Sequence, residues 1–332
     1  MPTILQNGIA RLSAVTSFLT LTILSAFAQK VDYSVTSVPE EAGLDFVQIT
    51  KESDYVCMPP VKRSRGGITW LTNKIIDVAP DGQTIAYLSL RNNTSNIFVK
   101  STDKQGTSNQ RTNRSGVMDF SYSPDGKQIC FSESKGKTNQ IFITDARQGY
   151  VCRQITSGAS DYSPVYSPDM KTIFFARMEN RGISIWGYDI EKNYLSSYTP
   201  GMNPTSDSNA NVLYLARESN GKGEIWKVDL NTGVEECVVS DNERTFFSPQ
   251  LSPDGAHLVL VGGTKIENGN TVYWNTDIYT CKTDGTNLQQ LTHHAADDLS
   301  PVWSSDGRFI YFISQRGNAD GIANVWRINS NI

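Results

Sequence analysis

The chain has 332 residues, enough to bury a large core in one domain or two. With 38% hydrophobic and 19% charged residues, it is too apolar to be disordered. Its formal net charge of -4 argues against general nucleic-acid binding, which needs a basic surface. The 14 Tyr, 13 Phe and 6 Trp favour a β-rich fold, because aromatic side chains are enriched in strands.

The first 28 residues differ from the rest of the chain. Arg11 is the only charged residue before Lys30, and the apolar run Ala14–Ala28 follows it and ends in Ala-Phe-Ala. This order is typical of a cleaved secretory signal, and the run is shorter than the roughly 20 residues of a membrane-spanning helix. We predict a signal peptide over residues 1–28, an N-terminal extension over 29–43, and a periplasmic or secreted protein without a membrane span after cleavage. An uncleaved membrane anchor is the alternative.

Export implies an oxidising compartment. The chain has 5 cysteines, without Cys-x-x-Cys spacing and without clustering with His, so the sequence predicts no zinc site and no cofactor. We expect mostly buried free thiols. The cysteines are Cys57, Cys130, Cys152, Cys237 and Cys281.

A tight-turn sequence recurs along the chain. Its clearest copy is Ser123-Pro124-Asp125-Gly126, between apolar runs at 119–122 and 128–132. Pro presets φ, Asp bonds its own backbone and Gly adopts the left-handed conformation that closes the turn, so each copy predicts a β-hairpin. The turn prolines are Pro80, Pro124, Pro168 and Pro253, and Ser305 takes this place in the last copy.

The spacing of these turns gives the number of repeats. The first three turns lie 44 residues apart, the next gap of 85 is almost twice that, and the last gap is 52. A degenerate copy at Asn203–Asn209 fills the long gap, which makes six copies. Each copy continues with a second strand, a polar loop, a third strand and, in most copies, a fourth. This pattern predicts an all-β chain, a six-bladed β-propeller of four-stranded antiparallel blades.

The last repeat lacks its fourth strand, because the sequence stops soon after the third. Phe46–Thr50 resembles Cys152–Thr156 and Leu288–Thr292, which are fourth strands of other copies. We therefore predict that residues 46–50 complete the sixth blade, which closes the ring and removes an exposed sheet edge. The propeller is expected to occupy residues 44–332 as a single domain.

The last two copies resemble the TolB-type propeller repeat, a WD40-like Pro-Asp repeat family. The resemblance covers roughly residues 44–332 and implies a six-bladed periplasmic propeller that binds proteins or peptides in the cell envelope. TolB itself has a further N-terminal domain that contacts envelope proteins; about fifteen residues separate the expected mature start from the first strand here, so we expect that domain to be absent. The matching residues are Leu291-Thr292, Asp298, Ser300–Trp303, Ser305–Gly307 and Phe312–Gly317.

Few residues are candidates for chemistry. The turn aspartates are expected to cap their turns, and Asp161 and Asp298 to bond backbone amides where first strands begin. Of the 3 His, His293 and His294 near Asp297 are the best candidates for metal or acid-base chemistry, although adjacent imidazoles tend to point apart. The sequence has no Gly-x-Ser-x-Gly nucleophile motif. The turn aspartates are Asp81, Asp125, Asp169, Asp254 and Asp306.

Two segments exceed the repeat, Lys51–Asn73 before the first blade and Gly262–Thr276 within the fifth. In a propeller the connections after strands two and four share one face, so both segments are expected on that face. Long loops with aromatic residues on a rigid scaffold are where binding usually occurs. The candidate binding residues there are Tyr55, Arg63, Arg65, Trp70, Arg91, Arg177, Arg217, Tyr273, Trp274, His293, His294 and Arg316.

These observations predict an exported, monomeric, non-catalytic propeller that binds an envelope protein or peptide. The alternative is a propeller enzyme, a glycan lyase or hydrolase that uses the central cavity. Propeller lyases of pectic fragments look similar but have several metal-binding His, whereas this chain has 3 His in all. A cell-wall-linked sensor is a third hypothesis, although the sequence has no peptidoglycan-binding segment.

Overall fold

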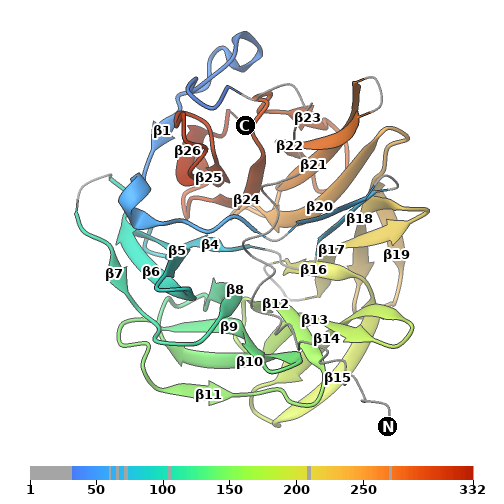
Figure 1. Cartoon of the computed structure of the whole chain (residues 1–332). Helices are drawn as coiled ribbons and strands as arrows, with labels where there is room; N and C mark the ends of the chain where they lie inside the picture. The colour runs from blue at the N-terminus through green and yellow to red at the C-terminus, as the bar shows by residue number, and fades with distance from the viewer. Residues whose placement is uncertain are drawn as a thin grey trace, which may run out of the picture.

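The computed structural model describes residues 32–331, except 60, 65–66, 71–73, 104–105, 208–210 and 269–270, and it describes side chains outside 60–73 and 268–272. In this part of the chain, six four-stranded antiparallel sheets are arranged radially around a central axis, as the sequence predicts (Figure 1). No helix in these ranges is long and apolar enough to cross a membrane.

Each blade runs from an inner strand at the axis to an outer strand at the perimeter (Figure 1). Blade one consists of β4 (Ile76–Val78), β5 (Thr84–Arg91), β6 (Thr94–Ser101) and β7 (Asn109–Gln110). Blade two consists of β8 (Val117–Tyr122), β9 (Gln128–Lys135), β10 (Thr138–Asp145) and β11 (Cys152–Gln154). Blade three consists of β12 (Ser160–Tyr166), β13 (Thr172–Glu179), β14 (Gly182–Asp189) and β15 (Tyr194–Pro200).

The second half of the ring repeats this order. Blade four consists of β16 (Met202–Ser206), β17 (Val212–Ser219), β18 (Lys222–Asp229) and β19 (Glu235–Val239). Blade five consists of β20 (Arg244–Leu251), β21 (His257–Asn268), β22 (Thr271–Lys282) and β23 (Gln289–Gln290). Blade six consists of β24 (Asp298–Trp303), β25 (Phe309–Ser314), β26 (Asn324–Asn329) and, from the N-terminal part of the chain, β1 (Val47–Gln48).

The ring is closed by the strand that the sequence predicts. In β1, Val47 pairs with Arg327 of β26 in antiparallel register, and the Thr50 hydroxyl accepts the Val325 amide at 2.8 Å. The same threonine bond recurs in blades one, two and five. In each of them the outer strand is short, and a threonine hydroxyl after it accepts a hydrogen bond from a backbone amide of the third strand. The equivalent threonines are Thr112, Thr156 and Thr292, each at 2.9 Å.

The recurring turn is held by its Ser and Asp side chains, as expected. In blade two, Asp125 accepts the Ser123 hydroxyl at 2.7 Å and the Lys127 amide at 3.0 Å, while Gly126 has φ 69°. The Ser123 hydroxyl in turn accepts the Gln128 amide at 2.9 Å. These bonds hold the pKa of Asp125 below its ordinary value, because they favour the charged carboxylate. The same Ser–Asp bond recurs at Asp169, Asp254 and Asp306.

The fourth copy reaches the same turn with different chemistry. Asp207 stands where the other copies have Ser, and its carboxylate accepts the Val212 amide at 2.9 Å. The Asp207 amide donates to the Val212 carbonyl at 2.9 Å, as Ser123 does to Gln128. A carboxylate on the first turn residue therefore replaces the Ser–Asp pair, which is why this copy is hard to recognise in the sequence.

The core lies between neighbouring blades, where the faces of adjacent sheets pack together. Fully buried aromatic side chains stand on middle strands, and each contributes on the order of 1.5–3 kcal/mol through removal of apolar surface from water. Because blades bury only each other's faces, every blade depends on its two neighbours. Examples are Tyr87, Phe131, Phe175, Tyr279 and Phe312.

Candidate functional site

The connections after strands two and four form one face of the ring, called here the loop face; the opposite side is the turn face. The Lys51–Asn73 segment leaves β1 beside blade one and contains a hairpin of β2 (Val61–Ser64) and β3 (Gly67–Trp70). Its β3 lies beside β18 and β20, of blades four and five. The segment therefore spans the ring on the loop face, and does not simply project from the rim beside blade one (Figure 1).

Tyr55 and Arg91, two predicted binding residues, lie together on blade one. The Arg91 guanidinium carbon is 5.8 Å from the Tyr55 ring centroid and 4.1 Å from that of Phe98. The Leu90 amide donates to the Tyr55 carbonyl at 3.0 Å, which fixes this segment against the end of β5. Tyr55 has φ 52° and its side chain is 57% exposed, so a large aromatic ring is presented to solvent.

Arg177 and Arg217 have partners within the chain. The Arg177 guanidinium donates to Asp161 at 2.7 Å and lies 4.5 Å from the Trp186 ring centroid. Arg217 donates to Glu235 at 2.8 Å and lies 4.6 Å from the Trp226 ring centroid. The expectation that Asp161 bonds a backbone amide was thus wrong about the partner. Both carboxylate oxygens of Asp161 instead accept hydrogen bonds from Arg177 on the second strand.

Arg316 is fully buried and belongs to the interior of the protein. It donates to Glu41 at 3.0 Å and to Asp298 at 2.5 Å, and all three side chains are 0% exposed. Asp298 therefore also bonds an arginine where a backbone amide was expected. Burial raises the pKa of Asp298 to about 6, and the Arg316 charge opposes that rise.

The N-terminal extension is docked on this arginine. The Arg316 guanidinium also donates to the Thr36 carbonyl at 3.1 Å, and the Gly317 amide donates to the Val35 carbonyl at 2.8 Å. The extension ends in the short 3-10 helix η2 (Pro39–Glu41), which presents the Glu41 carboxylate inward. A segment from one end of the sequence thus places a buried carboxylate against blade six.

The two adjacent histidines do not form a surface pair. His294 is 1% exposed, its Nδ1 accepts the Ala296 amide at 2.8 Å, and burial lowers its pKa. His293 donates its backbone amide to Glu41 at 2.8 Å. His293 therefore helps to hold the extension, while His294 is bound within its own loop. Within the described ranges, no group of three or more His, Cys, Asp or Glu side chains is placed to hold a metal ion.

The long hairpin of blade five also packs inward. Trp274 is 7% exposed and belongs to a core cluster with residues of blades four to six, so it is not an exposed anchor. Tyr273 on the same strand is partly buried. The side chains of Arg63 and Trp70, and the whole of Arg65, lie outside the described residues.

Asp277 is an exception to a repeated pattern. Just before the third-strand amide that the outer-strand threonine bonds, blades one, two and six carry a buried amide residue, and blade five carries Asp277. The amide residues are Asn96, Gln140 and Asn324. Its Oδ2 accepts a hydrogen bond from the side-chain amide of Gln290 at 3.1 Å, but no described group bonds its Oδ1. Burial, and then the Asp298 charge, raises the pKa of Asp277 to about 9, so it is protonated at neutral pH.

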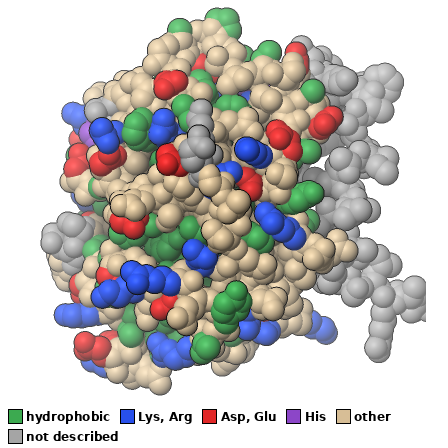
Figure 2. Space-filling view, turned by 90° about the vertical axis from the view of Figure 1, so that its left-hand side faces the viewer, with side chains coloured by type: hydrophobic (Ala, Val, Ile, Leu, Met, Phe, Trp, Pro, Cys, Tyr) green, Lys and Arg blue, Asp and Glu red, His purple; other side chains and the backbone are tan. Residues whose placement is uncertain are grey.

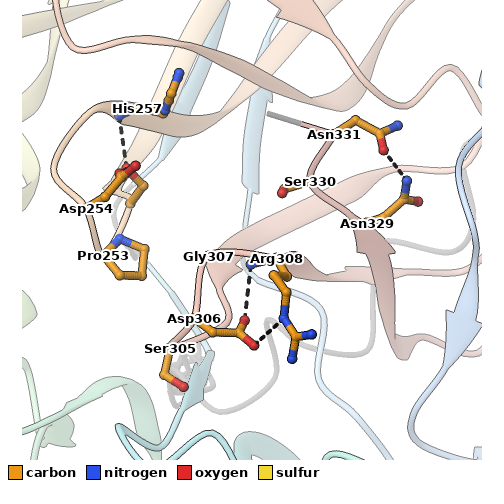
Figure 3. A pocket seen from close by; sticks show the side chains of 11 residues that line it. Pro253, Asp254, His257, Ser305, Asp306, Gly307, Arg308, Asn329, Ser330 and Asn331 are labelled. Atoms are coloured by element: carbon orange, nitrogen blue, oxygen red, sulfur yellow. Dashed lines mark hydrogen bonds and ion pairs between the residues drawn. The ribbon is translucent and has the colours of Figure 1, made fainter.

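A groove of about 600 Å³ lies on the turn face between blades five and six, opposite to the predicted binding face. Figure 3 shows the two adjacent turns and the residues after β26 around it. Its carboxylates already have partners: Asp254 accepts the Ala256 amide at 3.0 Å, and Asp306 accepts Arg308 at 2.6 Å. Sequence reasoning missed this groove, because it assigned these turns only a structural role.

A family model described as the TolB beta propeller domain matches residues 72–236 and 190–331. The chain belongs to this family. One curated relative, the Tol-Pal system protein TolB of Desulfosudis oleivorans, is 45% identical over 40 residues, which are 12% of this chain and 9% of that protein. The match to this TolB therefore spans less than a tenth of its length.

Solved structures share the TolB-type propeller fold. TolB from Acinetobacter baumannii has a TM-score of 0.60 at 19% identity, covering 75% of this chain and 64% of that one. A putative TolB from Agrobacterium tumefaciens has a TM-score of 0.57 at 15% identity, covering 87% and 98%. An oligogalacturonate lyase from Vibrio parahaemolyticus has a TM-score of 0.56 at 11% identity, covering 86% and 96%. At these identities the likeness concerns the fold alone.

Proposed function

We propose that this TolB-type propeller is an exported, non-catalytic scaffold that binds a protein or peptide of the cell envelope on its loop face. The observation that carries the proposal is the pair of Tyr55 and Arg91 on blade one. An exposed Tyr beside an Arg is typical of a binding interface, since these two residue types are enriched among the residues that contribute most of the binding energy. Family membership and the name of the Tol-Pal relative support an envelope role.

The sequence supports the proposed location. The pattern of residues 1–28 predicts export, although it lies outside the described residues. A protein that acts in the periplasm or outside the cell meets envelope proteins directly. The second candidate, a glycan lyase or hydrolase, draws on the likeness to the oligogalacturonate lyase fold. That likeness carries no site, because fold alone does not specify function.

The proposal is tested by site-specific photo-crosslinking in cells. A photoreactive phenylalanine analogue replaces Tyr55 in one strain and Tyr150 in another. Tyr150 is the matched control, because it is 70% exposed and lies on the turn face, in the connection from β10 to β11. We expect position 55, and not position 150, to trap a discrete envelope protein or peptide that mass spectrometry identifies. Equal products at both positions, or none at position 55, contradict the proposal.

A further inference from the structure

Arg91 of blade one and Arg316 of blade six occupy equivalent positions. Each lies two residues after a serine near the end of the second strand. That serine pairs with an Asn near the start of the third strand, Asn96 in blade one and Asn324 in blade six. Each guanidinium Nε donates to its serine hydroxyl, at 3.2 Å for Arg91 and 3.4 Å for Arg316. Each also lies over an aromatic ring, Phe98 in blade one and Phe46 in blade six, at 4.1 and 4.4 Å.

The two arginines differ in what they bind. Arg316 binds the carboxylate of Glu41, which lies in the short helix η2 of the N-terminal extension, and that of Asp298 on β24. In blade one, Val56 takes the place opposite Ser89 that Asp298 takes opposite Ser314, so no carboxylate is supplied there. Every Asp and Glu of the chain lies in the described ranges, and none of them forms a described ion pair with Arg91.

The loop face of the neighbouring blade carries several cations. The next blade presents Lys135 and Lys137 at the same hairpin position, and Arg114 precedes its first strand. The carboxylate among them, Glu133, is 1% exposed and already accepts Arg114 at 2.6 Å and Lys135 at 3.7 Å.

Other acids near this sector are already compensated. Beside Tyr55, Lys51 and Glu52 offset each other, and Asp54 is bound to Lys100 at 3.0 Å. Figure 2 views the ring from the side and shows Lys and Arg side chains, with Asp and Glu among them, over the lower half of this flank. This sector is therefore positive on a chain whose formal net charge is -4.

Blades one and two are joined at this sector. The Ser95 hydroxyl donates to the Val117 carbonyl at 2.6 Å, and the Asn96 amide donates to the Arg114 carbonyl at 3.2 Å. These bonds connect the start of β6 to the beginning of blade two. Arg91 and the blade-two cations consequently belong to one continuous part of the loop face.

We propose that the loop face of blades one and two binds an acidic peptide segment of a partner, with Arg91 pairing one of its carboxylates and Tyr55 packing beside it. This inference rests on the proposed function and names the chemistry of its partner. Blade six supplies the template, because there the equivalent arginine binds the Glu41 carboxylate and the Thr36 backbone carbonyl of one short segment. A peptide fits better than a glycan, since Arg316 combines carboxylate and peptide-carbonyl recognition at the same position.

The test uses fluorescein-labelled hexaglutamate, with hexaglutamine as the neutral probe, and measures fluorescence anisotropy at low ionic strength. We expect hexaglutamate to bind and hexaglutamine not to bind. Arg91→Gln should weaken hexaglutamate binding at least about fivefold, as expected for loss of one partly desolvated ion pair. Arg308→Gln is the matched control, because it removes the same charge from an exposed site on the turn face; its affinity should stay within about twofold of wild type.

Equal affinities of Arg91→Gln and Arg308→Gln for hexaglutamate overturn the inference, and so does equal binding of both peptides. Oligogalacturonate serves as a second acidic probe. If it binds in an Arg91-dependent way and hexaglutamate does not, the partner is a glycan and the peptide assignment fails. Failure of the proposed function is distinguishable: a partner trapped at Tyr55 but insensitive to Arg91→Gln leaves the function standing and removes this inference.

Discussion

Blades one and six carry the same arginine and use it differently. In blade six, Arg316 is closed over by the N-terminal extension and is 0% exposed, so its charge serves stability. In blade one, Arg91 has the equivalent serine and also lies over an aromatic ring, that of Phe98, but it pairs with no carboxylate among the described residues. The difference shows that a repeated position can be structural in one blade and available for binding in another. The substitutions below separate these two roles.

The largest effect is expected from removing the closing segment. Deletion of residues 29–50 eliminates β1, the Thr50 bond to Val325 and the Glu41 carboxylate. The sixth blade then has an open edge and Arg316 loses a buried partner, so the yield of folded protein and the melting temperature should fall sharply. Deletion of residues 29–31 alone is the control and should leave the melting curve unchanged. An unchanged curve for the longer deletion shows that the closure is unimportant.

Arg316→Gln and Arg91→Gln compare the two arginines directly. Arg316→Gln leaves Glu41 and Asp298 buried without a counter-charge and should lower the free energy of unfolding by about 3–5 kcal/mol. Arg91→Gln removes a partly exposed arginine and should change it by about 0.5 kcal/mol or less. Urea unfolding measures both. Similar losses for the two variants mean that the blades do not differ as described.

Asp277→Asn restores the amide that blades one, two and six have at the equivalent position. The pKa of Asp277 rises from 3.8 to about 9 on folding, so the folded state binds the proton more tightly. Stability is therefore lost progressively as pH rises from about 4 towards 9, and the Asn variant lacks this loss. We expect Asp277→Asn to be more stable at pH 7 by up to about 4 kcal/mol, and equally stable near pH 3.

The reverse change is the control for this prediction. Asn96→Asp introduces a carboxyl group at the equivalent place in blade one, where the Asn side chain donates to the Arg114 carbonyl at 3.2 Å. It should destabilise the protein at pH 7 more than at pH 3. If Asp277→Asn lowers stability at pH 7, the carboxyl group is ionised there and its environment differs from the one described.

The six blades and the closing strand could be predicted from sequence because both repeat a residue pattern that other copies also carry. The turn from Ser123 to Gly126 holds itself together, and Thr50 repeats a bond made at the end of other outer strands. Period and turn residues alone therefore specify the number of blades and their order.

The fate of individual site residues could not be predicted in this way. Whether Arg316 is exposed depends on Glu41, 275 positions away in the sequence. The sequence places Trp274 in a long loop, whereas in the structure the hairpin of blade five packs its side chain into the core. Long-range contacts of this kind produce no repeated pattern in the sequence. Only the structure therefore shows which of the predicted binding residues are buried, which are paired and which are exposed.

The most direct test of the account measures the affinity of the partner trapped at position 55 for four proteins: wild type, Tyr55→Ala, Arg91→Gln and the double variant. Each single substitution should weaken binding by about 1–2 kcal/mol, and the two effects should be non-additive because the side chains are in contact. The melting temperature should stay unchanged in all four. Wild-type affinity in every variant would contradict the claim that blade one is the binding site.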